Sequence, residues 1–352
     1  MKWRTERFAI AVPTSSPTWE DNDLEYISDF TEARADAPAS VPYVMTAPSE
    51  YDGHRLDYAI SRELGISRNH AQFIIKNGLV TPEREVRIKP SVKVAQGDIY
   101  TINLPPPETL ELEPEDVPFG VVHSDDDIIV VDKPAGLVAH PAPGHYHGTL
   151  VHGLLYRFPK FGEIKGVIRP GIVHRLDATT SGLMVVARNG LAMEKLYAQF
   201  KSRTVKKTYI FLCHGIPKDR HARIDAPIGR ASDGKKMTLR EDGRNAVTDY
   251  EILWDDLEFS LGKCVIHTGR THQIRVHMKS VGCPLVGDVL YAPSRETPFE
   301  DSRVFLHSWK LSFIHPRTGE RVCFRSFIPQ DLKSCLVAFR TRSRGTDPRL
   351  RF

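Results

Sequence analysis

A stretch rich in proline and acid, residues 105–118, most constrains how this 352-residue chain can fold. It holds five prolines, five acidic residues and no basic residue. Proline fixes φ and lacks a backbone N–H, so one helix cannot run through this stretch, and a stiff extended spacer is favoured. A chain of this length is also larger than a typical single domain. We therefore expect a linker at 105–118 between a small unit at 51–104 and a larger one at 119–339.

Net charge differs sharply between these segments. Residues 1–50 carry −5 and the linker carries −5, whereas 51–104 carry +2 and 119–352 carry +12. Residues 1–50 also lack helical or strand periodicity, which predicts a disordered acidic extension. The basic body favours a polyanionic partner. The arginine-rich end, 340–352, is interpreted either as an arm that contacts this polyanion or as a tail that only aids solubility.

Composition excludes several classes of protein. The hydrophobic fraction of 41% and the charged fraction of 26% are ordinary globular values, which excludes a wholly disordered chain. No apolar run approaches the roughly 18 residues that a membrane span needs, and the N-terminus lacks the apolar stretch of a signal peptide. The five cysteines include no C-x-x-C pair, so neither a disulfide framework nor a zinc ribbon is indicated. We expect a cytoplasmic protein that does not bind membranes.

Two short helices followed by strands are predicted in the small unit. Leu56, Ile60 and Leu64 recur at helical spacing, and Gly65 ends the pattern as a helix C′ residue does. Ser67 is a candidate N-cap for the second helix. That helix is expected to turn apolar side chains inward and polar ones outward: Ala71, Ile74, Ile75 and Leu79 inward, and Arg68, Gln72 and Lys76 outward. Strands are expected at 86–88, 92–94 and 99–102.

The larger unit mixes strands and helices. A hairpin is expected at 121–131, an amphipathic helix around 193–200, and buried strands at 209–213 and 304–306. Strands that mostly follow strands, with a few helices between them, indicate an α+β fold.

The tetrapeptide His-Arg-Leu-Asp occurs twice, at 54–57 and at 174–177. In the first copy Asp57 lies at the start of a predicted helix, where a carboxylate suits the helix dipole, so a structural role is favoured. The second copy lies on a loop between two apolar runs, and Arg175 stands two residues before Asp177. Rigid flanks place such a carboxylate, and a nearby cation keeps it ionised. Asp177 is therefore a catalytic candidate, with a surface or turn role as the alternative.

Arginine and histidine alternate with apolar residues along 265–277, which suits a strand edge facing a cleft. His267, His272 and His277 are five apart, which matches neither the helical nor the strand spacing of metal ligands. A second histidine group, within 140–152, has no carboxylate or cysteine at ligand-like spacing. We therefore predict no metal site. Ser181 lacks the G-x-S-x-G setting of a serine nucleophile.

The small unit resembles an S4 RNA-binding domain. The resemblance rests on Arg55-Leu56-Asp57, Gly65-Ile66-Ser67-Arg68, residues 75–80, Lys89-Pro90-Ser91 and Gln96-Gly97-Asp98. It implies a small α/β unit in which Arg68, Gln72 and Lys76 contact RNA. The stretch 81–84 departs from the tight turn that such domains usually carry before the next strand. A helix–hairpin spacer without RNA binding is the alternative.

The larger unit resembles the RluA-type family of pseudouridine synthases. The signature is residues 171–177, which end in His174-Arg175-Leu176-Asp177, followed by Thr180-Ser181-Gly182-Leu183. Three further motifs match in the expected order: 132–138, 206–209, and 268–277 with 284–288. The resemblance covers 119–330, and with the S4-like unit it fits the branch that acts on large-subunit ribosomal RNA. Ala178 departs from the charged or polar residue often found after the aspartate.

This resemblance implies a fold, an activity and roles for single residues. The fold is α+β, with a mixed, mainly antiparallel sheet and flanking helices. The enzyme would be an isomerase that breaks the N1–C1′ bond of a uridine, turns the uracil and joins C5 to C1′, with no metal or other cofactor. Asp177 would be the catalytic carboxylate, Arg275 its salt-bridge partner, and Tyr209 the tyrosine that stacks on the base. Substrate-binding roles would fall to Arg175, Ile274, Arg270 and His272.

The partner implied is RNA, either 23S-type ribosomal RNA or a pre-50S particle, bound by a monomer. Transfer RNA is an alternative substrate. Two other functions are kept open: a non-catalytic RNA-binding or ribosome-assembly factor, and a metal-dependent hydrolase that uses the histidines. Stoichiometric bound zinc would indicate the hydrolase, whereas a damaged set of active-site residues would indicate the assembly factor.

Overall fold

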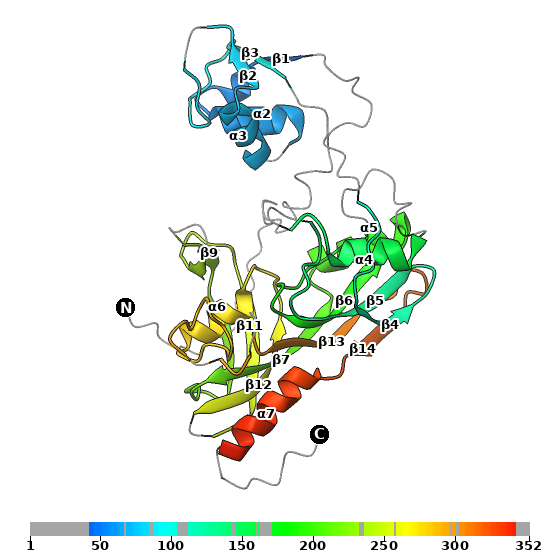
Figure 1. Cartoon of the computed structure of the whole chain (residues 1–352). Coiled ribbons are helices and arrows are strands. Elements are labelled where there is room, and N and C mark those ends of the chain that lie inside the picture. Colours follow the sequence, from blue (N-terminus) through cyan, green and yellow to red (C-terminus); the bar gives the residue numbers. More distant parts are fainter. Residues whose placement is uncertain are drawn as a thin grey trace.

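The computed structural model describes residues 42–66, 68–84, 87–103, 112–141, 145–159, 161, 171–231, 236–256, 258–295, 297–299 and 303–342. These residues form a small unit and a large unit, each with its own hydrophobic core. Figure 1 draws the small unit in blue to cyan and the large unit in green to red. Within the described ranges, no helix combines the length and the apolar character needed to cross a membrane.

The small unit packs two helices against a three-stranded antiparallel sheet. Its elements are β1 (Tyr43–Thr46), a 3-10 helix (Ser49–Tyr51), α2 (Leu56–Leu64), α3 (Arg68–Lys76), β2 (Val80–Pro82) and β3 (Ile99–Ile102), in the strand order β1-β3-β2. Both predicted helices are confirmed, and Gly65 ends α2 with a φ of 65°. Leu56, Ile60 and Ile74 are fully buried between the helices and the sheet.

The structure corrects two predictions in the small unit. Strand β1 lies within the stretch predicted to be disordered, and its Met45 is fully buried, so the unit begins before residue 51. Residues 87–94 form an irregular segment rather than two strands, while residue 86, like Ser67, lies outside the described residues. Backbone N–H groups at the start of α2 bond to this segment, as in Leu56 N–H to the Val92 carbonyl at 2.8 Å. These bonds satisfy backbone groups that the alternating pattern predicted to pair with a neighbouring strand.

The large unit is built on one nine-stranded sheet. Its strands are β4 (Gly120–Ser124), β5 (Ile128–Lys133), β6 (Ser181–Ala187), β7 (Lys206–His214), β8 (His221–Asp225), β11 (Val247–Asp255), β12 (Phe259–Ile266), β13 (Leu306–Ile314) and β14 (Arg321–Arg325). The order is β4-β5-β6-β13-β7-β12-β11-β8, with β14 paired to β13. Among the strands that the structure describes, only the β13–β6 pair is parallel, so the mixed, mainly antiparallel α+β sheet is confirmed. A separate pair joins β9 (Ile228–Arg230) and β10 (Met237–Leu239).

Helices lie on both faces of this sheet (Figure 1). They are α4 (Leu150–Arg157), α5 (Gly190–Lys201), α6 (Gln273–Ser280) and α7 (Gln330–Arg342). Alternate residues of β7 show the two faces: Tyr209 shares a core with α4 and α6, whereas Ile210 shares a core with α7. The other face of β5 and β6 packs on α5. The predicted hairpin at 121–131 and the amphipathic helix around 193–200 are confirmed.

Three expectations for the large unit change. Strand β12 ends at Ile266, and most of the predicted strand at 265–277 is instead a turn and helix α6. Of the strand predicted at 304–306, only Leu306 belongs to β13. The basic tail predicted from 340 begins inside α7, because that helix continues to Arg342, while 343–352 lie outside the described residues.

Candidate active site

The second His-Arg-Leu-Asp copy lies on the loop that leads into β6, as the sequence predicts. The Asp177 side chain is 21% exposed. Its backbone carbonyl accepts from the Thr180 N–H at 3.0 Å, which closes a tight turn. The next carbonyl, of Ala178, accepts from the Gly136 N–H at 2.8 Å and from Lys133 Nζ at 3.3 Å. The loop therefore presents a partly exposed carboxylate on a backbone tied to the segment after β5.

Lys133 holds this corner together from inside the protein. Its side chain is fully buried, and Nζ also donates to the carbonyls of Pro134 at 2.9 Å and Leu137 at 2.8 Å. Burial lowers the pKa of Lys133 to about 7, although the nearby negative charge of Asp177 acts in the opposite direction. Because an ammonium has three donors, these three carbonyls satisfy it.

Arg275 stands opposite Asp177, as predicted, but on the first turn of α6 rather than on a strand. Its Nη1 lies 3.4 Å from Asp177 Oδ2. Its other donors bind Asp288 in a bidentate pair, with Nε–Oδ2 at 2.7 Å and Nη2–Oδ1 at 2.8 Å. Asp288 is fully buried and also accepts from the Tyr291 N–H at 3.1 Å. Asp288 thus orients the guanidinium, while the longer contact leaves Asp177 available for other partners.

Sequence reasoning missed the role of Asp288. The residue ends the 284–288 motif, which contributes to the family resemblance but assigns no role to Asp288. Nothing local distinguishes an aspartate that clamps an arginine thirteen residues away from an ordinary turn residue. The available signal was the co-occurrence of Arg275 and Asp288 in neighbouring motifs.

The turn before α6 is held by a buried polar network. The Gln273 amide accepts from Thr268 Oγ1 at 2.7 Å and from the Arg270 N–H at 3.0 Å, and donates to the Val247 carbonyl at 3.0 Å. His272 follows this turn at a φ of 56°, a left-handed conformation that is uncommon outside glycine. These bonds fix where α6 begins, and so where Arg275 points.

His272 is oriented by a tyrosine. The hydroxyl of Tyr291 accepts from the Met237 N–H at 3.0 Å, so its own proton is free to be donated to His272 Nδ1 at 2.9 Å. Burial lowers the pKa of His272, which agrees with a neutral ring that accepts at Nδ1. The guanidinium of Arg275 lies over the Tyr291 ring, with its carbon 5.1 Å from the ring centre.

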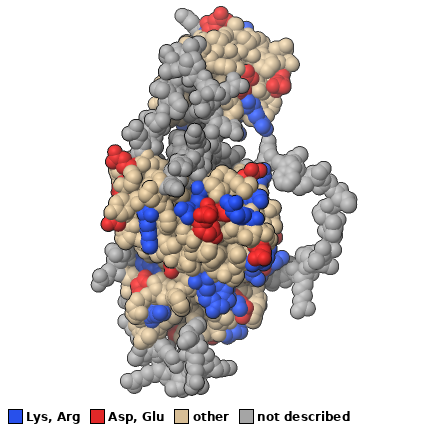
Figure 2. Space-filling view, turned by 90° about the vertical axis from the view of Figure 1, so that its right-hand side faces the viewer, with Lys and Arg blue, Asp and Glu red and all other residues tan. Residues whose placement is uncertain are grey.

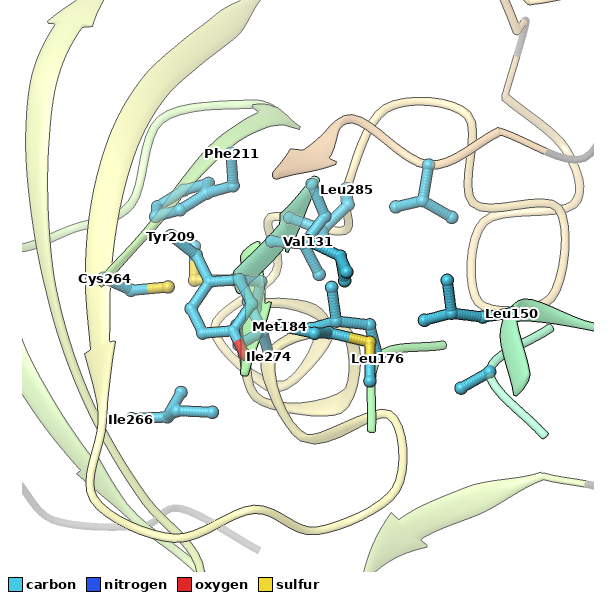
Figure 3. Close-up of a cluster of buried hydrophobic side chains, with 14 of the residues drawn as sticks. Val131, Leu150, Leu176, Met184, Tyr209, Phe211, Cys264, Ile266, Ile274 and Leu285 are labelled. Atoms are coloured by element: carbon cyan, nitrogen blue, oxygen red, sulfur yellow. The ribbon is translucent and has the colours of Figure 1, made fainter. Parts of the chain in front are cut away.

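Tyr209 and Ile274 lie in the main core beside this site. Both are at least 95% buried. In Figure 3 the Tyr209 ring has Cys264 on one side and Met184 and Leu176 on the other. Burial raises the pKa of Tyr209, and Cys264 and the charge of Asp177 raise it further. The phenol is therefore protonated at neutral pH, and it cannot take up a proton without first losing its own.

The remaining predicted site residues are placed differently. The Arg175 side chain is exposed, and Arg270 Nε donates to the Asn245 carbonyl at 2.8 Å. In the small unit, Arg68 and Gln72 turn toward Asp57, with Nη2–Oδ1 at 3.0 Å and Nε2–Oδ2 at 2.8 Å. Lys76 is exposed. Two of the three predicted RNA contacts of the small unit thus also hold its own structure together.

Two groups of described residues bring possible metal-binding atoms together. Glu115 lies within reach of His147 and His152, so a carboxylate from the linker joins the histidine group after all. Its Oε1 pairs with His147 Nδ1 at 3.1 Å, its Oε2 accepts from the Gly148 N–H at 2.9 Å, and His152 caps α4. The absence of a metal site stays a prediction, but these mutual hydrogen bonds already account for this group.

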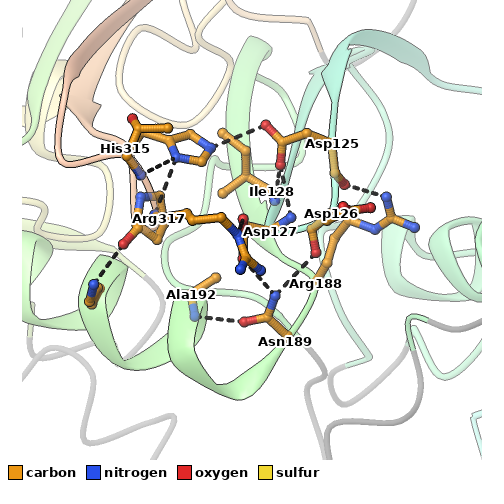
Figure 4. Close-up of polar contacts among 12 residues, drawn as sticks. Asp125, Asp126, Asp127, Ile128, Arg188, Asn189, Ala192, His315 and Arg317 are labelled. Carbon is orange, nitrogen blue, oxygen red and sulfur yellow. Dashed lines mark hydrogen bonds and ion pairs between the residues drawn. The ribbon is translucent and has the colours of Figure 1, made fainter.

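The second group, Asp125, Asp127 and His315, lines a hollow of about 550 Å³ that no predicted site residue lines. Figure 4 shows its hydrogen-bond network. Asp125 accepts from the Asp127 and Ile128 N–H groups, each at 2.8 Å, and pairs with His123 and His315. The Asp127 carboxylate binds Arg317 through both oxygens. These contacts already account for the two carboxylates of this group.

Comparison with known proteins identifies the family. The model of the RNA pseudouridylate synthase family matches residues 127–280, which include Asp177, Tyr209 and Arg275. A relative from Bacillus subtilis (strain 168), the uncharacterized RNA pseudouridine synthase YlyB, is 42% identical over 298 residues, which cover 84% of this chain and 97% of the relative. This chain belongs to the RNA pseudouridine synthase family.

Further relatives agree with this family membership. A ribosomal large subunit pseudouridine synthase D from Zymomonas mobilis is 39% identical over 301 residues, which cover 82% of this chain and 95% of the relative. Among solved structures, human RNA pseudouridylate synthase domain containing 1 aligns with a TM-score of 0.51 at 29% identity, over 66% of this chain and 98% of that one. The predicted family and isomerase activity on RNA are therefore confirmed.

Proposed function

We propose that this RNA pseudouridine synthase modifies uridines of large-subunit ribosomal RNA, with Asp177 as its catalytic carboxylate. The observation that carries the assignment is the contrast between two aspartates that share Arg275: Asp288 is fully buried and bidentate, whereas Asp177 is 21% exposed and 3.4 Å away. Asp288 holds the arginine, and Asp177 is left to meet substrate. The ribosomal target rests on relatives named ribosomal large subunit pseudouridine synthase D.

The reaction asks little of the protein beyond placement and charge. Asp177 acts at the ribose, either as a nucleophile at C1′ or as a base at the sugar, while the N1–C1′ bond breaks. The freed uracil turns, C5 bonds to C1′, the C5 proton leaves to solvent, and N1 takes up a proton from solvent. Because product and substrate are isomers, no oxidant, reductant or co-substrate enters the balance. Before substrate binds, the positive charge of Arg275 offsets the negative charge of Asp177.

The uridine must leave its stack to reach Asp177, at a cost of a few kcal/mol that is smaller in a loop. The exposed Arg175 is available to contact the phosphates of the extruded nucleotide, and Arg270 and His272 stand on the turn before α6 to contact the base or its neighbours. Ile274 and Tyr209 form the apolar wall on which the uracil rests. The phenol of Tyr209 is neutral, and its role here is to stack its ring on the uracil.

The small unit adds RNA affinity, with Lys76 and the exposed parts of Arg68 as its contacts. Among the residues drawn in colour in Figure 2, Lys and Arg are interspersed with Asp and Glu. We place RNA on the face where the Asp177 loop and the start of α6 meet. The protein would act as a monomer in the cytoplasm on 23S-type RNA or a pre-50S particle.

The test is substitution of Asp177→Asn, which keeps the size of the side chain and removes its charge. We expect tritium release from RNA labelled at uridine C5 to fall below detection, while RNA affinity and thermal unfolding stay near those of the native enzyme. Glu194→Gln is the matched control, because Glu194 is exposed on α5, which packs on the opposite face of the sheet. Release near the native rate from Asp177→Asn would refute the assignment.

The target is tested separately. Pseudouridines are mapped in total RNA from cells with and without the gene, complemented by the native or the Asp177→Asn chain. A site in large-subunit ribosomal RNA that only the native chain restores supports the proposal. Restored sites confined to transfer RNA would contradict the ribosomal target without affecting the role of Asp177.

A further inference from the structure

Arg303 is a buried arginine that binds the far end of the Asp177 loop. Its side chain is 5% exposed. Nη1 donates to the carbonyl of Thr179 at 3.0 Å, and Nη2 donates to Ser181 Oγ at 2.8 Å. Thr179 and Ser181 lie two and four residues after Asp177, so the guanidinium holds the loop just where it enters β6.

Ser181 Oγ joins Arg303 to a buried histidine. It accepts from Arg303 Nη2 and lies 2.9 Å from His307 Nδ1, to which it can donate its own proton. His307 is fully buried, and burial together with the charge of Arg303 lowers its pKa to about 4, so the ring is neutral and able to accept. Ser181 is 2% exposed, which leaves substrate no access to a serine–histidine pair. The network is therefore a support for the loop.

The backbone of Arg303 also braces the residue that orients Arg275. Gly287, directly before Asp288, has a φ of 78°, and a Cβ at this position would lie 2.1 Å from the Arg303 carbonyl oxygen. Only glycine allows the two backbones to approach this closely. Two residues further on, the Phe305 N–H donates to the Val286 carbonyl at 2.8 Å. One segment thus touches both the Asp177 loop and the Asp288 turn.

The orientation of Arg303 is set from the C-terminal helix. Asp331 on the first turn of α7 accepts from Arg303 Nε at 2.7 Å. The Asp331 side chain is 43% exposed, while Leu332 and Cys335 anchor α7 on the sheet. Arg303, His307 and Asp331 all lie outside residues 127–280, the part that matches the family model.

We propose that Arg303 is a positioning residue for the catalytic step. Asp331 of helix α7 acts through Arg303 to keep Asp177 and Arg275 correctly placed relative to each other. This inference rests on the proposed role of Asp177. Because misplacement of reacting groups by about 1 Å can cost roughly 100-fold in rate, loss of Arg303 slows the isomerisation itself. RNA binding, which depends on exposed groups elsewhere, is retained.

The test compares single-turnover tritium release at saturating enzyme with RNA affinity, for variants of the full chain at 25 °C. We expect Asp331→Ala to slow release about 10-fold and Arg303→Ala about 100-fold, with dissociation constants for RNA within about 2-fold of native. Asp331→Asn, which keeps an acceptor oxygen for Nε, restores most of the rate that Asp331→Ala loses. In the Arg303→Ala background, Asp331→Ala has no further effect, because Asp331 acts through Arg303.

Lys333→Ala, at an exposed position on the same turn of α7, is the control and leaves the rate unchanged. If Arg303→Ala fails to fold, the two Asp331 variants decide, since an exposed side chain can be changed without opening the core. A native rate in Asp331→Ala, or a loss of rate that follows a loss of RNA affinity, overturns the proposal. The activity of Asp177→Asn is measured independently. Native activity in that variant would refute the catalytic role of Asp177, whereas native activity in Asp331→Ala alone would refute only the positioning role of Arg303 and Asp331.

Discussion

The same four residues, His-Arg-Leu-Asp, have opposite surroundings in the two units. In the small unit Asp57 is fully buried on the first turn of α2, and Arg55, Arg68 and Gln72 all bind its carboxylate. In the large unit Asp177 lies on a loop and is partly exposed, and its contact with Arg275 is long. A carboxylate with every lone pair satisfied stabilises a fold, whereas one with spare capacity can act on a substrate.

The arginines differ in the same sense. Arg55 folds back on the aspartate of its own motif, with Nε–Oδ1 at 3.0 Å. Arg175 is exposed, and the cation beside Asp177 instead comes from 98 residues further along the chain, held by Asp288. Because Arg275 provides this cation, Arg175 does not have to fold back on Asp177 and stays exposed.

The largest expected effect tests whether Asp288 holds Arg275 for Asp177. In Asp288→Asn the bidentate charged pair is broken, and the guanidinium shifts toward Asp177. We expect single-turnover tritium release to fall about 100-fold, because the site loses its geometry while Asp177 remains. RNA affinity is measured in parallel and should stay near native. A rate within twofold of native would remove Asp288 from the account of the site.

A smaller effect is expected from the equivalent change in the small unit. Asp57→Asn leaves Arg55 and Arg68 able to turn to water, so the loss is limited to the hydrogen bonds of a buried carboxylate, about 2 kcal/mol. Hydrogen exchange of α2 and α3 should accelerate accordingly. Tritium release at saturating RNA should not change. If release fell as far as in Asp177→Asn, the two motifs would not have separate roles.

The third prediction separates the units by pH. His307 has a folded pKa of about 4, below its unfolded value of 6.5, so the unfolded state binds more protons and stability falls as pH drops from about 6.5 to 4. Burial raises the pKa of Asp57, but the hydrogen bonds from Arg55 and Gln72 outweigh burial and lower this pKa to about 2. The contribution of Asp57 to stability is therefore lost only as pH falls from about 3.8 toward 2. Acid near pH 5 should therefore weaken the large unit first.

The measurement is denaturant unfolding at pH 7 and pH 5, followed separately in each unit. The His307 contribution corresponds to about 2 kcal/mol between these pH values. His307→Asn, whose amide oxygen can accept from Ser181, should make the large unit less sensitive to pH. An unchanged slope in this variant would show that other groups govern the acid response.

The sequence by itself determined the division into two units, the helices of the small unit, the α+β class and Asp177 as the candidate carboxylate. These rest on local properties: proline content, spacing of apolar residues, and a polar interruption between apolar runs. The family resemblance extended this to Arg275 and Tyr209. Strand β1 was missed because its pairing with β3 joins residues more than fifty positions apart, which periodicity cannot show.

Only the tertiary structure showed how the two aspartates differ: Asp57 is buried among donors, whereas Asp177 is partly exposed. It also showed that 273–280 is a helix, that Asp288 binds Arg275 from 13 residues away, and that Arg303, which binds Asp331, contacts the Asp177 loop at Thr179 and Ser181. The physical reason is that satisfaction of a carboxylate or a guanidinium depends on donors and acceptors brought together by packing. Two identical tetrapeptides carry the same local information, and the sheet and helices around them give each its role.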